Sequence, residues 1–192
     1  MCGIVGYVGE RDCTDVLLDS LSKLEYRGYD SAGIAVFENG EITVEKAKGE
    51  LKNLREKVAE HKPMGHCGIG HTRWATHGEP SDINSHPHGN KRVSIVHNGI
   101  IENYNDIKNF LIEKGYTFIS ETDTETVAKL LDYYYEGDPV DAIIKTLKDV
   151  RGAYALGIVF KDFPDRIFAV RKDSPLIIGA GDEENFIASD VP

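Results

Sequence analysis

The sequence has few basic residues, few cysteines and no long apolar run. It holds 22 Lys and Arg against 32 Asp and Glu, so its net charge is −10. Because the basic residues are also scattered, the electrostatic footprint of a nucleic-acid-binding protein is absent. No apolar run approaches the roughly 18 residues of a spanning helix, and the start of the chain has no charged leader before an apolar stretch. We expect a cytoplasmic protein that binds neither nucleic acid nor membrane.

Metal-binding and disulfide patterns are also missing. The three cysteines, Cys2, Cys13 and Cys67, are odd in number and unrelated in spacing, so they indicate neither a disulfide framework nor a zinc site. Five histidines fall in or near loops, which leaves a metal-dependent amidohydrolase as an alternative; they are His71, His77, His86, His88 and His97. HExxH is absent, however, and the HPH at 86–88 has no second paired motif. We predict no metal and no cofactor.

The composition is that of one globular domain over residues 1–192. Apolar residues make up 41% of the chain, and their spacing alternates between about 2 and about 3.6 residues, which indicates interleaved strands and helices. Helical spacing predicts one helix over about 13–26. Four more helices are marked by apolar positions within 51–58, 104–111, 127–131 and 142–147.

Period-2 runs predict about eight strands. Two of them flank Asn39-Gly40, which is the strongest short hairpin signal and excludes a purely parallel sheet. The other expected strands lie at 3–8, after residue 66, at 92–97, and at 153–160, 166–170, 176–179 and 185–189. Together these elements indicate an α+β fold of layered sheets and helices.

Cys2 is the most informative residue. Removal of Met1 would leave a thiol and a free α-amino group on one amino acid. An α-amino group titrates at about 7.7 to 8.0 and can act as the general base for the thiol, which is the N-terminal-nucleophile arrangement. The alternative is that Cys2 is a small apolar residue opening a buried strand. If Met1 is retained, the proposed base is lost.

The segment HTRWATHG at 71–78 is a candidate carboxylate site. Arg73 stands at the end of an expected strand, where its planar guanidinium can bind a carboxylate through two hydrogen bonds. Trp74 can close over an apolar part of the ligand. Taken singly, a surface salt bridge for Arg73 and a core position for Trp74 are equally ordinary roles.

Two further segments carry polar candidates. Asn98 and Gly99 are expected after a strand, where an Asn amide and a Gly N–H can form an oxyanion hole; a hairpin turn fits less well, because a helical pattern follows. Asp123 can bind an ammonium group, although the local sequence favours a role as the N-cap of the following helix. Thr122 can also be that N-cap.

These motifs also resemble those of a known family. MCGIVGYVG, LEYRGYDSAG, HTRWATHGEPS, HNGIIENY, SETDTE, RGAYAL and ENFIASD together span essentially the whole chain. They closely resemble the glutaminase domain of glucosamine-6-phosphate synthases. YRGYDSAG and HTRWATHG are more similar to this family than to phosphoribosyl-pyrophosphate amidotransferases or asparagine synthetases.

The resemblance implies an N-terminal-nucleophile hydrolase fold, an αββα sandwich of two antiparallel sheets between helical layers. It also implies that L-glutamine is hydrolysed through a γ-glutamyl thioester on the N-terminal cysteine. Carried over by motif, Cys2 resembles the nucleophile, and Asn98 with the Gly99 N–H resembles the oxyanion hole. The remaining roles are the carboxylate clamp Arg73 with Thr76 and His77 nearby, the ammonium partners Asp123 and the Gly99 carbonyl, the covering residue Trp74, and Arg27 near the catalytic terminus.

In the family, sugar-phosphate isomerase domains follow in the same chain and use the ammonia to convert fructose 6-phosphate to glucosamine 6-phosphate. The family implies a homo-oligomeric full-length enzyme. Because nothing in this sequence corresponds to those domains, we expect a domain of a longer protein that releases ammonia to solvent and makes no amino sugar. The alternatives are the glutaminase domain of another class II amidotransferase and a non-catalytic glutamine-binding module.

Overall fold

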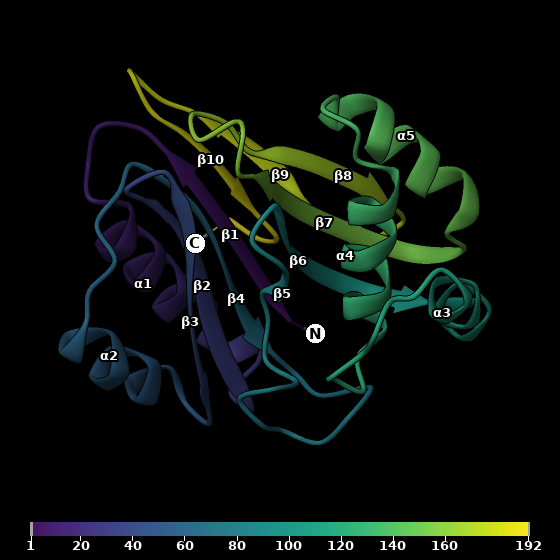
Figure 1. The fold of residues 1–192 in the computed structure, drawn as a ribbon. Coiled ribbons are helices and arrows are strands. Elements are labelled where there is room, and N and C mark those ends of the chain that lie inside the picture. The colour runs from purple at the N-terminus through teal and green to yellow at the C-terminus, as the bar shows by residue number, and fades with distance from the viewer. Residues whose placement is uncertain (1, 192) are drawn as a thin grey trace.

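The computed structural model describes residues 2–191, which form two antiparallel sheets between two layers of helices (Figure 1). The strands are β1 (Gly3–Val8), β2 (Ser31–Glu38), β3 (Glu41–Lys48), β4 (Cys67–Arg73), β5 (His88–Gly89), β6 (Val93–Ile101), β7 (Gly152–Phe160), β8 (Phe168–Lys172), β9 (Ile177–Ala180) and β10 (Asn185–Ala188). The α-helices are α1 (Cys13–Leu24), α2 (Leu51–Glu60), α3 (Tyr104–Glu113), α4 (Asp123–Tyr134) and α5 (Pro139–Asp149).

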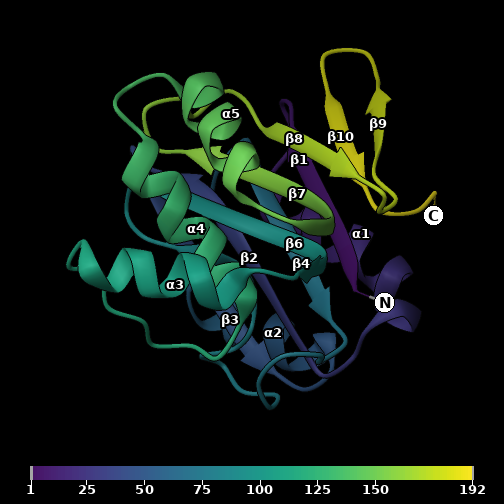
Figure 2. The same cartoon turned by 90° about the vertical axis from the view of Figure 1, so that its right-hand side faces the viewer.

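The first sheet has the strand order β3-β2-β4-β1-β10-β9, and α1 and α2 cover its outer face. Apolar residues at helical spacing in these two helices, among them Leu17, Leu21 and Leu54, are fully or almost fully buried against the strands. Figure 2 shows the β9–β10 hairpin projecting at the far edge of this sheet. The nucleophile candidate precedes β1, which lies between β4 and β10.

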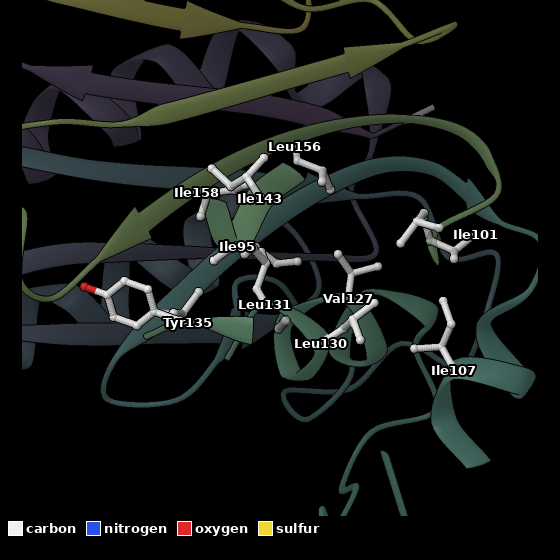
Figure 3. Close-up of a cluster of buried hydrophobic side chains, with 14 of the residues drawn as sticks. Ile95, Ile101, Ile107, Val127, Leu130, Leu131, Tyr135, Ile143, Leu156 and Ile158 are labelled. Carbon is white, nitrogen blue, oxygen red and sulfur yellow. The ribbon is translucent and has the colours of Figure 1, made fainter. Parts of the chain in front are cut away.

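The second sheet has the order β5-β6-β7-β8, and α3, α4 and α5 cover it. Figure 3 shows how α4 presents Val127, Leu130 and Leu131 to strand residues such as Ile95. A third buried cluster lies between the two sheets and includes Ile69 of β4. The predicted α+β, αββα sandwich is therefore confirmed.

The predicted hairpin is confirmed in its detail. Asn39 and Gly40 have φ of 50° and 79°, as a two-residue type I′ turn requires, and β2 pairs with β3 in an antiparallel ladder from Ser31↔Lys48 to Glu38↔Glu41. The twist of this turn matches that of the flanking strands, which is why Asn-Gly gives a reliable signal.

The end of the first helix and the number of strands differ in detail from expectation. The predicted helix over about 13–26 is found as an α-helix that ends at Leu24 and a 3₁₀ turn over Glu25–Arg27. The described residues form ten strands rather than about eight, partly because the two-residue strand β5 is too short to show a period. None of the helices within residues 2–191 is long and apolar enough to span a bilayer.

Candidate active site

Strand pairing places Cys2 beside the HTRWATHG segment. β1 and β4 run antiparallel with Gly3 opposite Thr72, so the residue before β1 meets the residues after β4. The Trp74 backbone N–H donates to Cys2 Sγ at 3.2 Å, and Sγ lies 3.5 Å from the Trp74 carbonyl oxygen. Cys2 is half-buried at this position.

The surroundings of Cys2 favour the neutral thiol. Burial raises the pKa of Cys2, and the hydrogen bond from the Trp74 amide together with the positive charge of Arg73 only partly opposes this effect. A thiol in this environment needs a base to become a nucleophile. The predicted base depends on the removal of Met1, which lies outside the described residues.

The backbone of Cys2 is held from two sides. Its carbonyl oxygen accepts a hydrogen bond from Asn98 Nδ2 at 2.8 Å and another from Arg27 Nε at 3.2 Å. Asn98 belongs to the second sheet, so this contact joins the nucleophile candidate to the opposite layer of the sandwich. This is the one hydrogen bond that Asn98 Nδ2 donates within the described residues.

Asn98 and Gly99 lie within β6 and not after it, which corrects the prediction. The ladder between β6 and β7 continues without interruption from Val93↔Phe160 to Ile101↔Gly152. Gly99 keeps its place in this ladder with a positive φ of 113°. A Cβ there would lie 2.0 Å from the Ala153 carbonyl oxygen, so only glycine fits.

Beyond Ile95, β6 presents a free edge toward the site, because β5 pairs only with Ser94 and Ile95. The groups on this edge bind side chains: the His97 carbonyl oxygen lies 2.9 Å from His71 Nε2, and the Ile101 N–H donates to Asp123 at 2.9 Å. Gly99 lies midway between His97 and Ile101. In an antiparallel sheet, every second residue directs its N–H and C=O to the same side of the strand. The Gly99 N–H and C=O therefore point to the free edge, as those groups of His97 and Ile101 do.

Asp123 is not the N-cap of α4, contrary to the local prediction. Thr122 occupies the cap, and its Oγ1 accepts from the Glu125 N–H. Asp123 is the first helical residue; it is only 4% exposed, and its Oδ2 accepts the Ile101 N–H. Two adjacent residues with equal capping ability cannot be distinguished from local sequence, because contact with β6 decides between them.

Asp123 forms no ion pair with a Lys or Arg side chain within the described residues. The nearest basic group is His97, whose Nδ1 lies 4.0 Å from Asp123 Oδ1. Burial lowers the pKa of His97, so its imidazole is neutral at pH 7. The Asp123 side chain therefore lines the cavity without a cationic side chain of the protein bound to it.

Arg73 carries the complementary charge. It is 3% exposed, so a surface salt bridge is excluded. Its Nη2 donates to the carbonyl oxygens of His77 and Gly78, the latter at 2.9 Å, and its Nη1 lies 3.4 Å from the Glu79 carbonyl oxygen. All three partners are neutral, and no carboxylate in residues 2–191 forms an ion pair with Arg73. Burial lowers its pKa, though a guanidinium remains charged at neutral pH.

All nine candidates lie around one cavity of about 360 Å³. They are Cys2, Arg27, Arg73, Trp74, Thr76, His77, Asn98, Gly99 and Asp123. The wall also contains residues that the sequence did not single out for binding, namely His86, His97, Ile100, Thr122, Thr124, Ser174 and Pro175. Trp74 is 46% exposed and not a core residue; its ring packs edge-on against Tyr29 with centroids 5.8 Å apart.

The clustered histidines form a buried stack beside this cavity. The rings of His71 and His86 are parallel with centroids 3.9 Å apart, and His88 meets His86 edge-on. Burial lowers the pKa of His71 to about 3 and that of His86 and His88 well below its usual value. Across residues 2–191, no three His, Cys, Asp or Glu side chains are grouped so as to hold a metal ion.

Comparison with known proteins agrees with the fold and the cavity. The sequence model of a family described as the glutamine amidotransferase domain matches residues 71–192. The chain therefore belongs to the glutamine amidotransferase domain family. It is 26% identical to the solved glutamine phosphoribosylpyrophosphate amidotransferase from B. subtilis, complexed with ADP and GMP, with a TM-score of 0.86 over 98% of this chain and 42% of that one.

Two curated relatives are more similar in sequence. Both carry the name glutamine–fructose-6-phosphate aminotransferase (isomerizing). The protein from Clostridium perfringens is 59% identical over 100% of this chain, and that from Caldanaerobacter subterraneus subsp. tengcongensis is 61% identical over 100%. This chain spans 32% of the length of each relative.

Proposed function

We propose that this domain hydrolyses L-glutamine to glutamate and ammonia with Cys2 as the nucleophile. One observation carries the proposal: a buried cation, Arg73, and a buried anion, Asp123, face one cavity together with a thiol and lack charged partners. Burying these two charged side chains is costly. A ligand that carries one anionic and one cationic group offsets this cost by pairing with both. The α-carboxylate and α-ammonium of an amino acid satisfy both residues, and the thiol then faces its side chain.

The reaction needs no group beyond the chain and water. After Met1 is removed, the Cys2 α-amine accepts the thiol proton while Sγ bonds to the side-chain amide carbon. The proton passes to the amide nitrogen, the C–N bond breaks, and ammonia leaves a γ-glutamyl thioester. Water then adds to the thioester carbon, the C–S bond breaks, and glutamate and the free thiol are released.

The remaining wall residues have supporting roles in this proposal. Asn98 Nδ2 and the Gly99 N–H stabilise the oxyanion of each tetrahedral intermediate. The Gly99 carbonyl assists Asp123 with the ammonium group, Thr76 and His77 line the carboxylate end, and Trp74 covers bound glutamine. Arg27 holds the Cys2 carbonyl and so acts on the backbone of the nucleophile.

For the longer protein we propose the activity that the relatives' names describe. The ammonia would be transferred within the full-length chain to fructose 6-phosphate, giving glucosamine 6-phosphate in covalently linked isomerase domains of a homo-oligomer. The identities of 59% and 61% to these aminotransferases, against 26% to the phosphoribosylpyrophosphate enzyme, support this choice over another class II amidotransferase. The domain alone should release free ammonia and form no amino sugar.

The test separates catalysis from binding. The variant Cys2→Ala, with its N-terminus verified by mass spectrometry, should lose glutaminase activity and still bind glutamine by calorimetry, because Arg73 and Asp123 are intact. Unchanged turnover in Cys2→Ala would refute the thioester mechanism. Binding without turnover in correctly processed wild-type protein would favour the non-catalytic module.

A further inference from the structure

The end of β10 extends toward the start of β1. Regular pairing of the two strands ends at Val5↔Ala188. One residue further, the Ser189 N–H donates to the Ile4 carbonyl oxygen at 3.0 Å, and Ser189 Oγ accepts from the Ile4 N–H at 2.9 Å. The Ser189 hydroxyl thus extends the ladder by one step. Ser189 is 2% exposed and Ile4 is 0% exposed, so water does not compete for these bonds.

The next residue, Asp190, reaches the Cys2 backbone through Arg27. Asp190 Oδ2 accepts from Arg27 Nη1 at 2.8 Å and also from the Tyr26 hydroxyl. On the other edge of the same guanidinium, Arg27 Nε donates to the Cys2 carbonyl oxygen at 3.2 Å. The Arg27 side chain is 9% exposed, and Asp190 is the carboxylate that pairs with it in the described part of the chain.

A nucleophile at a chain end needs such support. Once Met1 is removed, Cys2 is restrained covalently on one side only, and chain ends are poorly ordered unless other groups hold them. The contacts at the Ile4 amide and carbonyl fix the strand. The hydrogen bonds from Arg27 and Asn98 to the Cys2 carbonyl oxygen restrict rotation of the Cys2 backbone, from which the Sγ side chain extends. Misplacement by about 1 Å can lower a rate on the order of 100-fold.

We propose that Ser189 and Asp190 are positioning residues for the Cys2 nucleophile, Ser189 through Ile4 and Asp190 through Arg27. The inference rests on the proposed function. Neither residue lines the cavity that Cys2 and Arg73 share, so neither contacts the substrate. Their loss should therefore lower kcat and leave KM for glutamine nearly unchanged.

The experiment compares Ser189→Ala, Asp190→Ala and Asp190→Asn with wild-type protein whose N-terminus is Cys2. Asp165→Asn is the matched control, because Asp165 forms an exposed ion pair with Arg166 on the loop before β8. We expect Asp190→Ala and Ser189→Ala to lower kcat at least tenfold, with KM within twofold. Asp190→Asn keeps an oxygen acceptor for Arg27 and should recover part of the rate. The control should match wild type.

A second readout does not depend on turnover. Amide hydrogen exchange in the peptide containing Ile4 should accelerate in Ser189→Ala and stay at the wild-type rate in Asp165→Asn. Unchanged kcat in both alanine variants, or a rise in KM at constant kcat, would overturn the inference. Wild-type protein that fails to turn over glutamine would instead refute the proposed function, and the wild-type measurement alone reveals that outcome.

Discussion

At the residue scale, the proposed ligand follows from Arg73 and Asp123, which line one cavity and form no ion pair with a Lys, Arg, Asp or Glu side chain in the described residues. Arg73 is oriented by three backbone carbonyls, and Asp123 by one backbone amide. Neutral partners fix the geometry of both groups and leave their charges available. On the proposed function, the two charges bind the two ends of a zwitterion, and the position of Cys2 decides which side chain can react.

Arg73→Lys should weaken glutamine binding. A lysine ammonium lacks the fork that binds both carboxylate oxygens, and the loss of one charge-assisted hydrogen bond costs about 1.5 to 3 kcal/mol. We expect KM to rise between about 10-fold and 100-fold, with a smaller change in kcat, in steady-state glutaminase assays. An unchanged KM would show that Arg73 does not bind the carboxylate.

Gly99→Ala should damage the site more than its small size suggests. The backbone there has a φ of 113°, and a Cβ would lie 2.0 Å from the Ala153 carbonyl oxygen. β6 must shift, and the Gly99 N–H and C=O move with it. We expect kcat/KM to fall at least 100-fold and the melting temperature to fall. Gly40→Ala is the comparison. It also places a Cβ at a positive φ, 79°, but that Cβ meets nothing within 4 Å and the turn is remote from the cavity, so we expect a lower melting temperature with kcat/KM unchanged. Wild-type activity in Gly99→Ala would contradict the role of this edge.

At the scale of elements, the site forms where the start of β1, the end of β4, the free edge of β6 and the start of α4 meet. The N-terminus of α4 delivers Thr122, Asp123 and Thr124 to the cavity wall. Packing of the helix against the second sheet, seen in Figure 3, fixes its axis. The cap at Thr122 fixes where it begins.

Thr122→Ala should destabilise the domain by at least about 1 kcal/mol, the usual cost of losing a side-chain N-cap. Thr122 Oγ1 also lies 3.1 Å from His88 Nε2, so the same change leaves a buried imidazole nitrogen without its partner. Denaturant unfolding measures the loss, and Thr122→Ser, which keeps the hydroxyl, should restore most of it. Equal stability of the alanine and wild-type proteins would show that the cap contributes nothing.

The sequence predicted the individual helices and strands better than it predicted how they contact one another. Period-2 and helical spacing identified β1, the β2–β3 hairpin and all five helices, because these signals are local. It could not place Asn98 inside β6 or assign the α4 cap to Thr122, because pairing with β7 and contact with β6 decide both. Ser174 and Pro175 line the cavity without any local signal. The grouping of residues 2, 73, 98 and 123 was accessible only through the family motifs.

At the scale of the whole molecule, the stacked histidines couple stability to pH. His71, His86, His88 and His97 are buried with lowered pKa values, and an unfolded histidine titrates near pH 6.5. Below about pH 6.5 the unfolded chain therefore binds more protons than the folded one. The stabilisation is complete above that pH and is lost as the pH falls toward the folded pKa, about 3 for His71.

His71→Gln should make the free energy of unfolding less sensitive to acid. Each such histidine contributes up to about 1.4 kcal/mol per pH unit, so the slope between pH 6 and about pH 4 should decrease by roughly that amount. His61→Gln, at an exposed position, should leave the slope unchanged. Urea unfolding at several pH values measures both. The same slope in His71→Gln and wild type would contradict the assignment.

The central claim is that Cys2, and neither of the other cysteines, is the nucleophile. Cys13 and Cys67 are free but buried, and burial raises the pKa of Cys13, and that of Cys67 to about 12. Protein that begins at Cys2 should be treated with a thiol-directed electrophilic glutamine analogue and analysed by peptide mass spectrometry. The account predicts one adduct, on Cys2, formed together with loss of glutaminase activity, prevented by L-glutamine and unaffected by a chelator. An adduct confined to Cys13 or Cys67, or activity that survives full modification of Cys2, would contradict it.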